Sequence, residues 1–374
     1  MSDTSGYLIV GSVAAIVTFV LTPIVAWLAR RFGCVVEPDE RRVHTKPTPD
    51  IGGVAMFLGL LAAVLLAMHM DRFDPLFVSN SEPLGAVVAC SIVFIVGFAD
   101  DLFDLSPPAK VTGTVIAGLV LVQFGVTMFY FRAPFFGVVT LDDWVPLVTI
   151  LWLLGLTQAV NLIDGLDGLA AGIVAIGAAS FFVYSQYLAR HGAVDSTNVG
   201  PMLAIIAAGV CVGFLPHNFN PARIFMGDSG ALFLGALMAV STSVVGGRVD
   251  PSSEQQFSGQ TYFFVAPLFI PLFILGVPIL DMAFAILRRA TRRQGIAHAD
   301  KGHLHHRLMS LGHGQRRSVL ILWLWTALLS AFVLFPLATP SGSTVAPIGV
   351  VALGLALYTV LHPEVRRNRE GLGT

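Results

Sequence analysis

Three polar side chains stand at three-residue intervals between two apolar segments. Asn161, Asp164 and Asp167 belong to the stretch Asn-Leu-Ile-Asp-Gly-Leu-Asp-Gly-Leu-Ala-Ala-Gly. If this stretch is helical, the spacing places all three on roughly one face. Carboxylates beside membrane-length apolar segments are costly unless water, a cation or a ligand meets them. The pattern therefore favours a functional site, and the simpler alternative is a polar turn that joins two helices.

Further acidic residues lie in two other motifs. Asp100 and Asp101 open Asp-Asp-Leu-Phe-Asp, and Asp228 lies in Phe-Met-Gly-Asp-Ser-Gly. Together with Asp164 and Asp167 they would form a cluster of carboxylates that cannot all stay ionised without a cation. Oxygen ligands favour Mg²⁺, Mn²⁺ or Ca²⁺. Because Mg²⁺ is often held by one or two carboxylates plus substrate phosphates, the sequence predicts a reaction between phosphate groups.

Each motif also has a simpler interpretation. The Asp100–Asp101 pair could solvate a helix end, and Asp228 or the serine after it could cap a helix start. His303, His305 and His306 form a fourth polar motif inside a basic loop. A zinc site there is disfavoured because no cysteine is near and the neighbouring residues are basic.

The composition is that of a membrane protein. Of the 374 residues, 55% are hydrophobic and 12% are charged, whereas soluble domains carry about 25% charged residues. The three cysteines are far apart, so neither a disulfide nor a thiolate metal site is expected. The first apolar run is long enough to span and lacks a basic start, so we expect no cleaved signal peptide.

Apolar segments of membrane-helix length recur along the whole chain, so we expect an all-α polytopic integral membrane protein with about eleven transmembrane helices. No soluble domain is evident, and residues 1–374 are interpreted as one transmembrane domain. The expected spans lie near 7–29, 51–70, 84–99, 111–131, 145–160, 168–189, 201–216, 230–247, 262–287, 319–337 and 345–362.

The basic residues orient these spans. Eighteen of the 22 Lys and Arg residues fall on one set of loops, which is the cytoplasmic side by the positive-inside rule. This predicts an external N-terminus, a cytoplasmic C-terminus and a plasma (inner) membrane location. All four motifs then face the cytoplasm, in the loops near 100–110, 161–167, 217–229 and 288–318, and the loop near 30–50, which carries Lys46, lies on the same side.

The motifs, in this order, resemble those of the polyprenyl-phosphate N-acetylhexosamine-1-phosphate transferases, glycosyltransferase family 4. They are Asp-Asp-x-x-Asp, Asn-Leu-Ile-Asp-Gly-Leu-Asp-Gly-Leu-Ala, Pro-Ala-Arg-Ile-Phe-Met-Gly-Asp-Ser-Gly and His-Leu-His-His. The interrupted histidine run is similar to the WecA/TagO-type branch. The related MraY-type phospho-N-acetylmuramoyl-pentapeptide transferases usually have an uninterrupted run. The resemblance covers nearly the whole chain.

The resemblance implies that undecaprenyl phosphate attacks the β-phosphorus of UDP-N-acetylglucosamine, that UMP leaves, and that the lipid-linked sugar starts a cell-envelope polysaccharide. It implies Asp100 and Asp101 as catalytic acids at the reacting phosphates, and Asp228 with Asp164 at a bound Mg²⁺, with Mn²⁺ as an alternative. The residues implied in substrate binding are Asn161, Asp167, Asn218, Phe225, His303, His305, His306, Lys46 and Lys110.

Other interpretations stay open at this point. The donor could be another UDP-N-acetylhexosamine or the muramoyl-pentapeptide nucleotide. A transporter would also use intramembrane acids, including Asp281, but does not explain why the motifs gather at one face. The lipid bilayer is an expected partner, nucleic acid is not, and a homodimer is left open.

Overall fold

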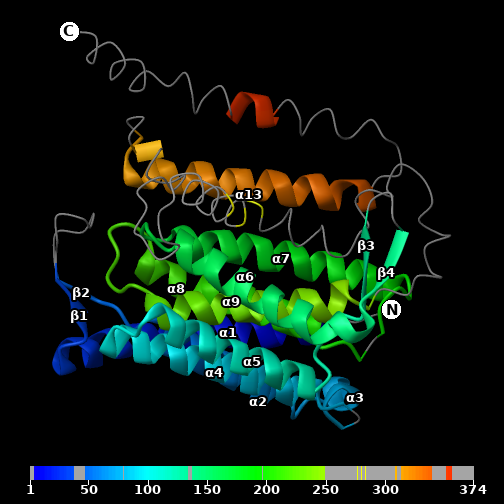
Figure 1. The fold of residues 1–374 in the computed structure, drawn as a ribbon. Coiled ribbons are helices and arrows are strands. Elements are labelled where there is room, and N and C mark those ends of the chain that lie inside the picture. The colour runs from blue at the N-terminus through cyan, green and yellow to red at the C-terminus, as the bar shows by residue number, and fades with distance from the viewer. Residues whose placement is uncertain are drawn as a thin grey trace, which may run out of the picture.

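The computed structural model describes residues 4–37, 47–78, 80–133, 137–195, 197–248 and 313–338, with 276, 279, 283, 308–309 and 351–355. As expected, the described residues are mostly helical (Figure 1). The helices are α1 (Ser5–Phe32), α2 (Gly53–Ala67), α3 (Asp74–Val78), α4 (Glu82–Phe103), α5 (Pro107–Gln123), α6 (Val145–Ile163), α7 (Leu169–Arg190), α8 (Gly200–Asn218), α9 (Gly227–Gly246) and α13 (Gln315–Ala338).

Among the described residues, seven helices are long and apolar enough to cross a membrane. An eighth span results if α2 and the bent segment Asp71–Val78, which meet at 91°, are counted together. The expected spans 262–287 and 345–362 lie largely outside the described residues. The total of eleven spans and the orientation of the termini therefore stay predictions.

Two short hairpins depart from an all-helical fold. β1 (Val35–Val36) pairs antiparallel with β2 (Thr48–Pro49), and β3 (Tyr130–Ala133) pairs antiparallel with β4 (Gly137–Thr140). The expected span 111–131 is wrong at its end, since α5 stops at Gln123 and a turn at Gly125, with φ +75°, leads into β3. The β1–β2 and β3–β4 hairpins lie at opposite ends of the bundle (Figure 1).

Helix α9 lies at the centre of the bundle. Every residue from Gly227 to Gly246 is buried except Asp228. It packs mainly against α2, α4, α6 and α8. Close packing depends on small residues, because a Cβ added at Gly235 would lie 2.5 Å from the Cα of Thr157 on α6. A buried central helix fixes the position of Asp228, the one charged side chain of α9.

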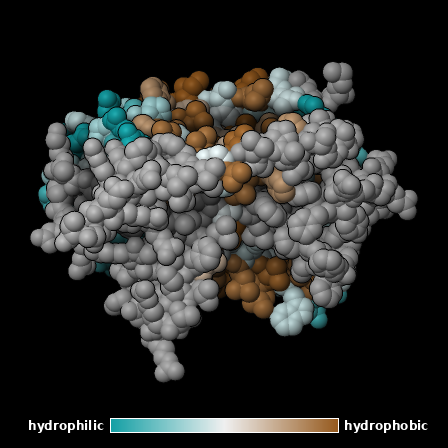
Figure 2. All heavy atoms as spheres, turned by 90° about the horizontal axis from the view of Figure 1, so that it is seen from above, coloured by the Kyte–Doolittle hydropathy of each residue, from teal (hydrophilic) through white to brown (hydrophobic). Residues whose placement is uncertain are grey.

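The outer helices expose apolar side chains. Helix α1 presents Ile16, Phe19, Val20, Ile24 and Trp27 to its surroundings, which suits contact with lipid tails. In Figure 2, apolar residues gather around the middle of the visible face and hydrophilic ones lie toward its ends. This distribution agrees with a bundle that crosses a bilayer.

The stretch from Asn161 to Gly172 is not one helix. Helix α6 ends at Ile163, α7 begins at Leu169, and Gly168 between them has φ +78°. The Asp-Gly pairs favour a turn over a continuing helix, because glycine adopts positive φ without steric cost. The one-face arrangement expected for a helix is therefore wrong, and a turn displays the two acids instead.

Candidate active site

Three helix-to-helix connections place the predicted site residues at one end of the bundle. Helix α4 ends where α5 begins, α6 ends where α7 begins, and α8 ends where α9 begins. Since consecutive helices run in opposite directions, these connections and the β1–β2 hairpin share one end (Figure 1). The acids from the three motifs therefore meet although up to 128 positions separate them in sequence.

A lysine joins two of these acids. Lys110 Nζ lies 2.7 Å from Asp100 Oδ2 and 2.8 Å from Asp228 Oδ2. The other oxygen of Asp100 accepts the backbone N–H of Leu105 at 2.8 Å. All three charged side chains are only 10–27% exposed, so the ammonium group is screened weakly and offsets the repulsion between the two carboxylates.

Asp101 has a different environment from its neighbour Asp100. Its two oxygens accept the backbone N–H groups of Asp228 at 2.7 Å and of Ser229 at 3.1 Å. These N–H groups belong to the first turn of α9, where they have no partner within the helix and carry the positive end of the helix dipole. Asp101 thus fixes the start of the central helix, and with it the Asp228 side chain.

The close approach of α4 and α9 requires Gly97. A Cβ at this position would lie 2.5 Å from the carbonyl oxygen of Asp228. A larger residue one turn before the Asp100–Asp101 pair would separate the two helices. The glycine therefore permits the pair to reach the start of α9.

A sixth carboxylate, Asp50, joins the group and was missed by the sequence analysis. The loop that carries it pairs with the loop before α9, through Phe225 N to Pro49 O at 2.8 Å and Gly52 N to Phe225 O at 2.9 Å. Asp50 interacts electrostatically with Asp101. An acid directly before Ile-Gly-Gly at the start of a membrane helix was the signal that could have found it.

Asp164 lies within this group of acids. Burial is the largest cause that raises its pKa well above the ordinary value, and the neighbouring carboxylates, Asp50 first and Asp228 second, raise it further. Among the described residues, no side-chain or backbone donor is seen to hydrogen-bond its carboxylate. Asn161, one turn earlier, turns its amide toward Asp228. The turn after α6 thus supplies one carboxylate that lacks a countercharge.

Asn218 ties two loops of the site together. Its side-chain oxygen accepts the N–H of Gly168 at 3.0 Å, and its side-chain nitrogen donates to the carbonyl of Ile224 at 3.0 Å. The residue is 2% exposed. Its amide therefore positions the turn after α6 against the loop before α9.

Asp167 connects the same turn to the C-terminal helix. One oxygen, Oδ2, accepts the side-chain N–H of Asn220 at 2.8 Å and the backbone N–H of Ala222 at 3.0 Å. The Asn220 amide also donates to Gln315 Oε1 at 2.7 Å, and Arg316 Nε donates to the Asn220 carbonyl at 3.1 Å. This network fixes the first turn of α13 beside the site.

The remaining predicted residues divide into two groups. Phe225 lies in the loop before α9 with a half-buried ring. Lys46, His303, His305, His306 and also Asp281 lie outside the described residues. Within the part of the chain that is described, no group of three or more His, Cys, Asp or Glu side chains is arranged to hold a metal ion by itself.

Comparison with known proteins gives the family. The family model described as glycosyl transferase family 4 matches residues 83–246, which include Asp100, Asp101, Lys110, Asp164 and Asp228. The chain is 37% identical to the decaprenyl-phosphate N-acetylglucosaminephosphotransferase of Mycolicibacterium smegmatis, over 97% of this chain and 90% of the relative.

Two further relatives have different named substrates. The undecaprenyl-phosphate alpha-N-acetylglucosaminyl 1-phosphate transferase of Thermotoga maritima is 30% identical over 82% of this chain and 84% of its own length. The phospho-N-acetylmuramoyl-pentapeptide-transferase of Desulforudis audaxviator is 36% identical, but over only 63% of this chain and 75% of its own. The ordered acidic motifs and these similarities agree, and the chain belongs to glycosyl transferase family 4, the polyprenyl-phosphate N-acetylhexosamine-1-phosphate transferases.

Proposed function

We propose that the protein transfers N-acetylglucosamine 1-phosphate from UDP-N-acetylglucosamine to a polyprenyl phosphate and releases UMP. The observation that carries the proposal is the site in which Lys110 joins Asp100 to Asp228 at the polar end of an otherwise apolar bundle. Such a site suits a reaction between two phosphate groups, in which positioning and charge neutralisation supply most of the catalysis. The relatives with high coverage of this chain are named as transferases of N-acetylglucosamine phosphate.

The reaction makes and breaks one bond at the same phosphorus. An oxygen of the polyprenyl phosphate attacks the β-phosphorus of the donor, and the bond from that phosphorus to the oxygen bridging it to the α-phosphorus breaks. UMP leaves with the bridging oxygen. The product is a polyprenyl diphosphate that carries the sugar, and it starts a cell-envelope polysaccharide.

Asp100 and Lys110 have the geometry for distinct roles in this step. Lys110, which already bridges two acids, is placed to transfer its hydrogen bonds to phosphate oxygens. Asp100 takes a proton from the attacking lipid phosphate when that group arrives protonated. We assign this role to Asp100 and not to Asp101, because the Asp101 oxygens accept the backbone N–H groups that begin α9, whereas the Lys110 partner of Asp100 can turn to a substrate phosphate.

A divalent cation fits the chemistry of the donor set. Asp228 and Asp164 would hold it, because both are carboxylates at the polar end of the bundle and they repel one another. Because no three-ligand group is present among the described residues, water and substrate phosphate oxygens would have to supply the other ligands, an arrangement that Mg²⁺ commonly adopts. Such a cation would neutralise the charge of the diphosphate.

The protein's own residues prepare the rest of the site. The Asn218 amide and the Asp167 network hold the loops from which Phe225 and Asp228 project. Phe225 has a half-buried ring that can stack on uracil. His303, His305, His306 and Lys46 are proposed, from the resemblance alone, to contact the diphosphate or sugar.

The test is an assay of the purified protein in detergent. UDP-N-acetylglucosamine, UDP-N-acetylgalactosamine and UDP-N-acetylmuramoyl-pentapeptide are offered separately with undecaprenyl or decaprenyl phosphate and Mg²⁺. The expected result is UMP and a lipid product of the N-acetylglucosamine mass, lost in excess chelator and restored by Mg²⁺ or Mn²⁺. Product from the pentapeptide donor alone would replace the proposed donor, and no UMP from any donor would contradict transferase activity.

A further inference from the structure

A chain of side-chain hydrogen bonds leads from the first turn of α13 to the Asp167 carboxylate. Gln315 Oε1 accepts one N–H of the Asn220 amide at 2.7 Å, and Asp167 Oδ2 accepts from the same nitrogen at 2.8 Å. Arg316 Nε donates to the Asn220 side-chain oxygen at 3.2 Å and to the Asn220 carbonyl oxygen at 3.1 Å. Gln315 lies outside residues 83–246, which the family model matches. The match therefore assigns it no role.

The Asn220 amide has one favourable orientation. Its nitrogen carries two N–H groups, one for each of its two acceptors, and its oxygen meets the Arg316 donor. A rotated amide would place its oxygen against the oxygens of Asp167 and Gln315, and acceptors repel one another. Removal of the half-buried Gln315 side chain leaves one N–H without this partner and weakens the constraint on the amide. Gln315 thus acts on Asp167 through Asn220.

Both donors to Asp167 hold the same oxygen. Oδ2 accepts from Asn220 and, at 3.0 Å, from the backbone N–H of Ala222. Within the described part of the chain, Oδ1 has no hydrogen-bond donor, and the side chain is half-buried. Two bonds to one oxygen fix where the other oxygen lies. Oδ1 is therefore the atom that can accept an N–H or O–H group of a substrate.

Helix α13 holds the same turn at a second level. The ring of Trp323, about two turns after Gln315, donates its N–H to Leu169 O at 3.4 Å and lies 5.7 Å from the ring of Phe219. Leu169 begins α7 directly after the turn that carries Asp167, and Phe219 follows α8. The hydrogen bonds at the first turn of α13 therefore start from a packed helix, as a positioning contact requires.

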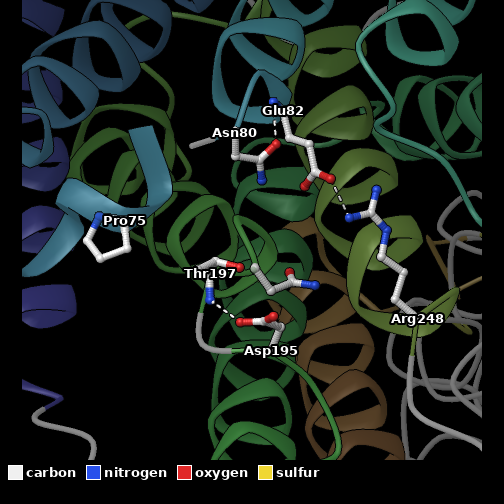
Figure 3. A pocket seen from close by; sticks show the side chains of 7 residues that line it. Pro75, Asn80, Glu82, Asp195, Thr197 and Arg248 are labelled. Atoms are coloured by element: carbon white, nitrogen blue, oxygen red, sulfur yellow. Dashed lines mark hydrogen bonds and ion pairs between the residues drawn. The ribbon is translucent and has the colours of Figure 1, made fainter. Parts of the chain in front are cut away.

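A different polar contact lies at the other end of the bundle. The Arg248 guanidinium pairs with Glu82, which joins the end of α9 to the start of α4 (Figure 3). Because α4 carries Asp100 in its last turn, roughly 30 Å of helix at 1.5 Å per residue separates the pair from the site. Loss of this pair should lower stability without reaching the nucleotide sugar. The pair therefore provides a control for a purely structural contact.

We propose that Gln315 is a positioning residue for the nucleotide sugar: through Asn220 it fixes the Asp167 carboxylate that binds this substrate. The inference rests on the proposed function, in which Asp167 contacts the donor. The acids and the lysine at the reacting phosphates belong to a separate set of bonds. Loss of Gln315 should therefore weaken binding and change turnover little, the pattern of an interaction made equally in the ground state and the transition state.

The test compares Gln315→Ala with the wild type, as full-length proteins in uncharged detergent with Mg²⁺. Isothermal titration calorimetry gives the Kd of UDP-N-acetylglucosamine, and UMP release gives kcat. We expect a Kd higher by about threefold to tenfold, the value of one hydrogen bond, and a kcat within about twofold of the wild type. The thermal midpoint should stay unchanged, because alanine suits a helix. Gln315→Met, which keeps the length of the side chain, repeats the measurement if the alanine variant does not fold.

The route through Asn220 is tested by a double variant. In an Asn220→Ala background, Gln315→Ala should not change Kd further, because the residue through which it acts is gone. Gln123→Ala is the matched control, since it makes the same change at an exposed position at the end of α5. Glu82→Gln is the structural control, and it should lower the thermal midpoint while Kd equals that of the wild type.

The outcomes separate this inference from the proposed function. A wild-type Kd in Gln315→Ala, a lower thermal midpoint or kcat without a changed Kd, or full additivity in the double variant would overturn the positioning role and leave the proposed function intact. If the wild type binds the nucleotide sugar but releases no UMP, the proposed function fails and the Kd values still decide the role of Gln315. If the wild type does not bind the nucleotide sugar, both are overturned.

Discussion

At the scale of single residues, two adjacent acids have different partners. Asp100 shares Lys110 with Asp228, whereas Asp101 accepts two backbone N–H groups at the start of α9. In the proposed reaction, substrate phosphates would take over the hydrogen bonds of the shared lysine, whereas the two backbone bonds would keep holding the start of α9. We therefore propose that Asp100 takes part in the chemistry and that Asp101 positions the start of α9.

Asp100→Asn tests the chemical half of this division. The amide keeps the size of the side chain and the bond from Leu105, but it cannot take a proton. We expect kcat for UMP release to fall by about 10²–10⁴-fold, with a smaller change in KM for the nucleotide sugar. If the variant keeps the wild-type kcat, Asp100 has no catalytic role and only solvates the end of α4.

Asp101→Asn tests the positioning half. An amide accepts through only one of its two polar atoms, so one N–H of the first turn of α9 loses its partner. The expected loss of stability is about 1–3 kcal/mol, seen as a lower unfolding midpoint, together with lower activity. The control is Asp104→Asn, the exposed third acid of the same motif, which has φ +52° and so tolerates asparagine. An unchanged midpoint for Asp101→Asn would refute the anchoring role.

At the scale of helices and turns, the sequence predicts the spans well where hydrophobicity alone decides them. The expected segments near 7–29, 168–189 and 230–247 correspond to α1, α7 and α9 within a few residues. The convergence of the acidic motifs at one end also follows from alternating helix direction. Hydropathy and charge are thus enough to predict that the site residues lie at one end of the bundle.

The sequence does not predict the backbone hydrogen bonds between distant loops. Asp50 enters the site because its loop bonds the loop before α9, about 175 positions away, through Pro49, Gly52 and Phe225. Asn220 acts through side-chain bonds to Asp167 and Gln315. Neither contact has a local periodicity or composition that marks it, since each depends on how separate loops meet in the folded protein.

Gly172 shows how one small residue sets the distance between α7 and α13. A Cβ at this position would lie 1.9 Å from an atom of the Trp323 ring, whose N–H donates to Leu169 O at 3.4 Å. Gly172→Ala should therefore lower the unfolding free energy by about 1–3 kcal/mol, the usual cost of overpacking. The matched control is Gly155→Ala on α6, where the added Cβ meets nothing within 4 Å and helix propensity favours alanine. The two variants should shift the thermal midpoint in opposite directions, and a stabilised Gly172→Ala would show that the two helices can separate without cost.

At the scale of the whole molecule, the bundle has two chemically different ends. One end holds the six carboxylates of the candidate site, Lys110 and the β1–β2 hairpin. The other holds the β3–β4 hairpin and the Glu82–Arg248 pair. The nucleotide sugar of the proposed reaction is a soluble cytoplasmic compound, while the acceptor is a membrane lipid. The carboxylate end should therefore face the cytoplasm, in agreement with the excess of basic residues on that side of the chain.

Cysteine labelling decides this orientation. Ser106 is exposed at the carboxylate end and its side chain makes no cap hydrogen bond, and Asp143 is exposed at the other end. Each is replaced by cysteine in a Cys34→Ala background, in which the two remaining native cysteines are buried. A membrane-impermeant maleimide applied to intact cells should label Asp143→Cys but not Ser106→Cys, and permeabilised cells should show labelling of both. The reverse pattern would place the carboxylates outside the cell, where no UDP-sugar is supplied, and would contradict both the topology and the proposed donor.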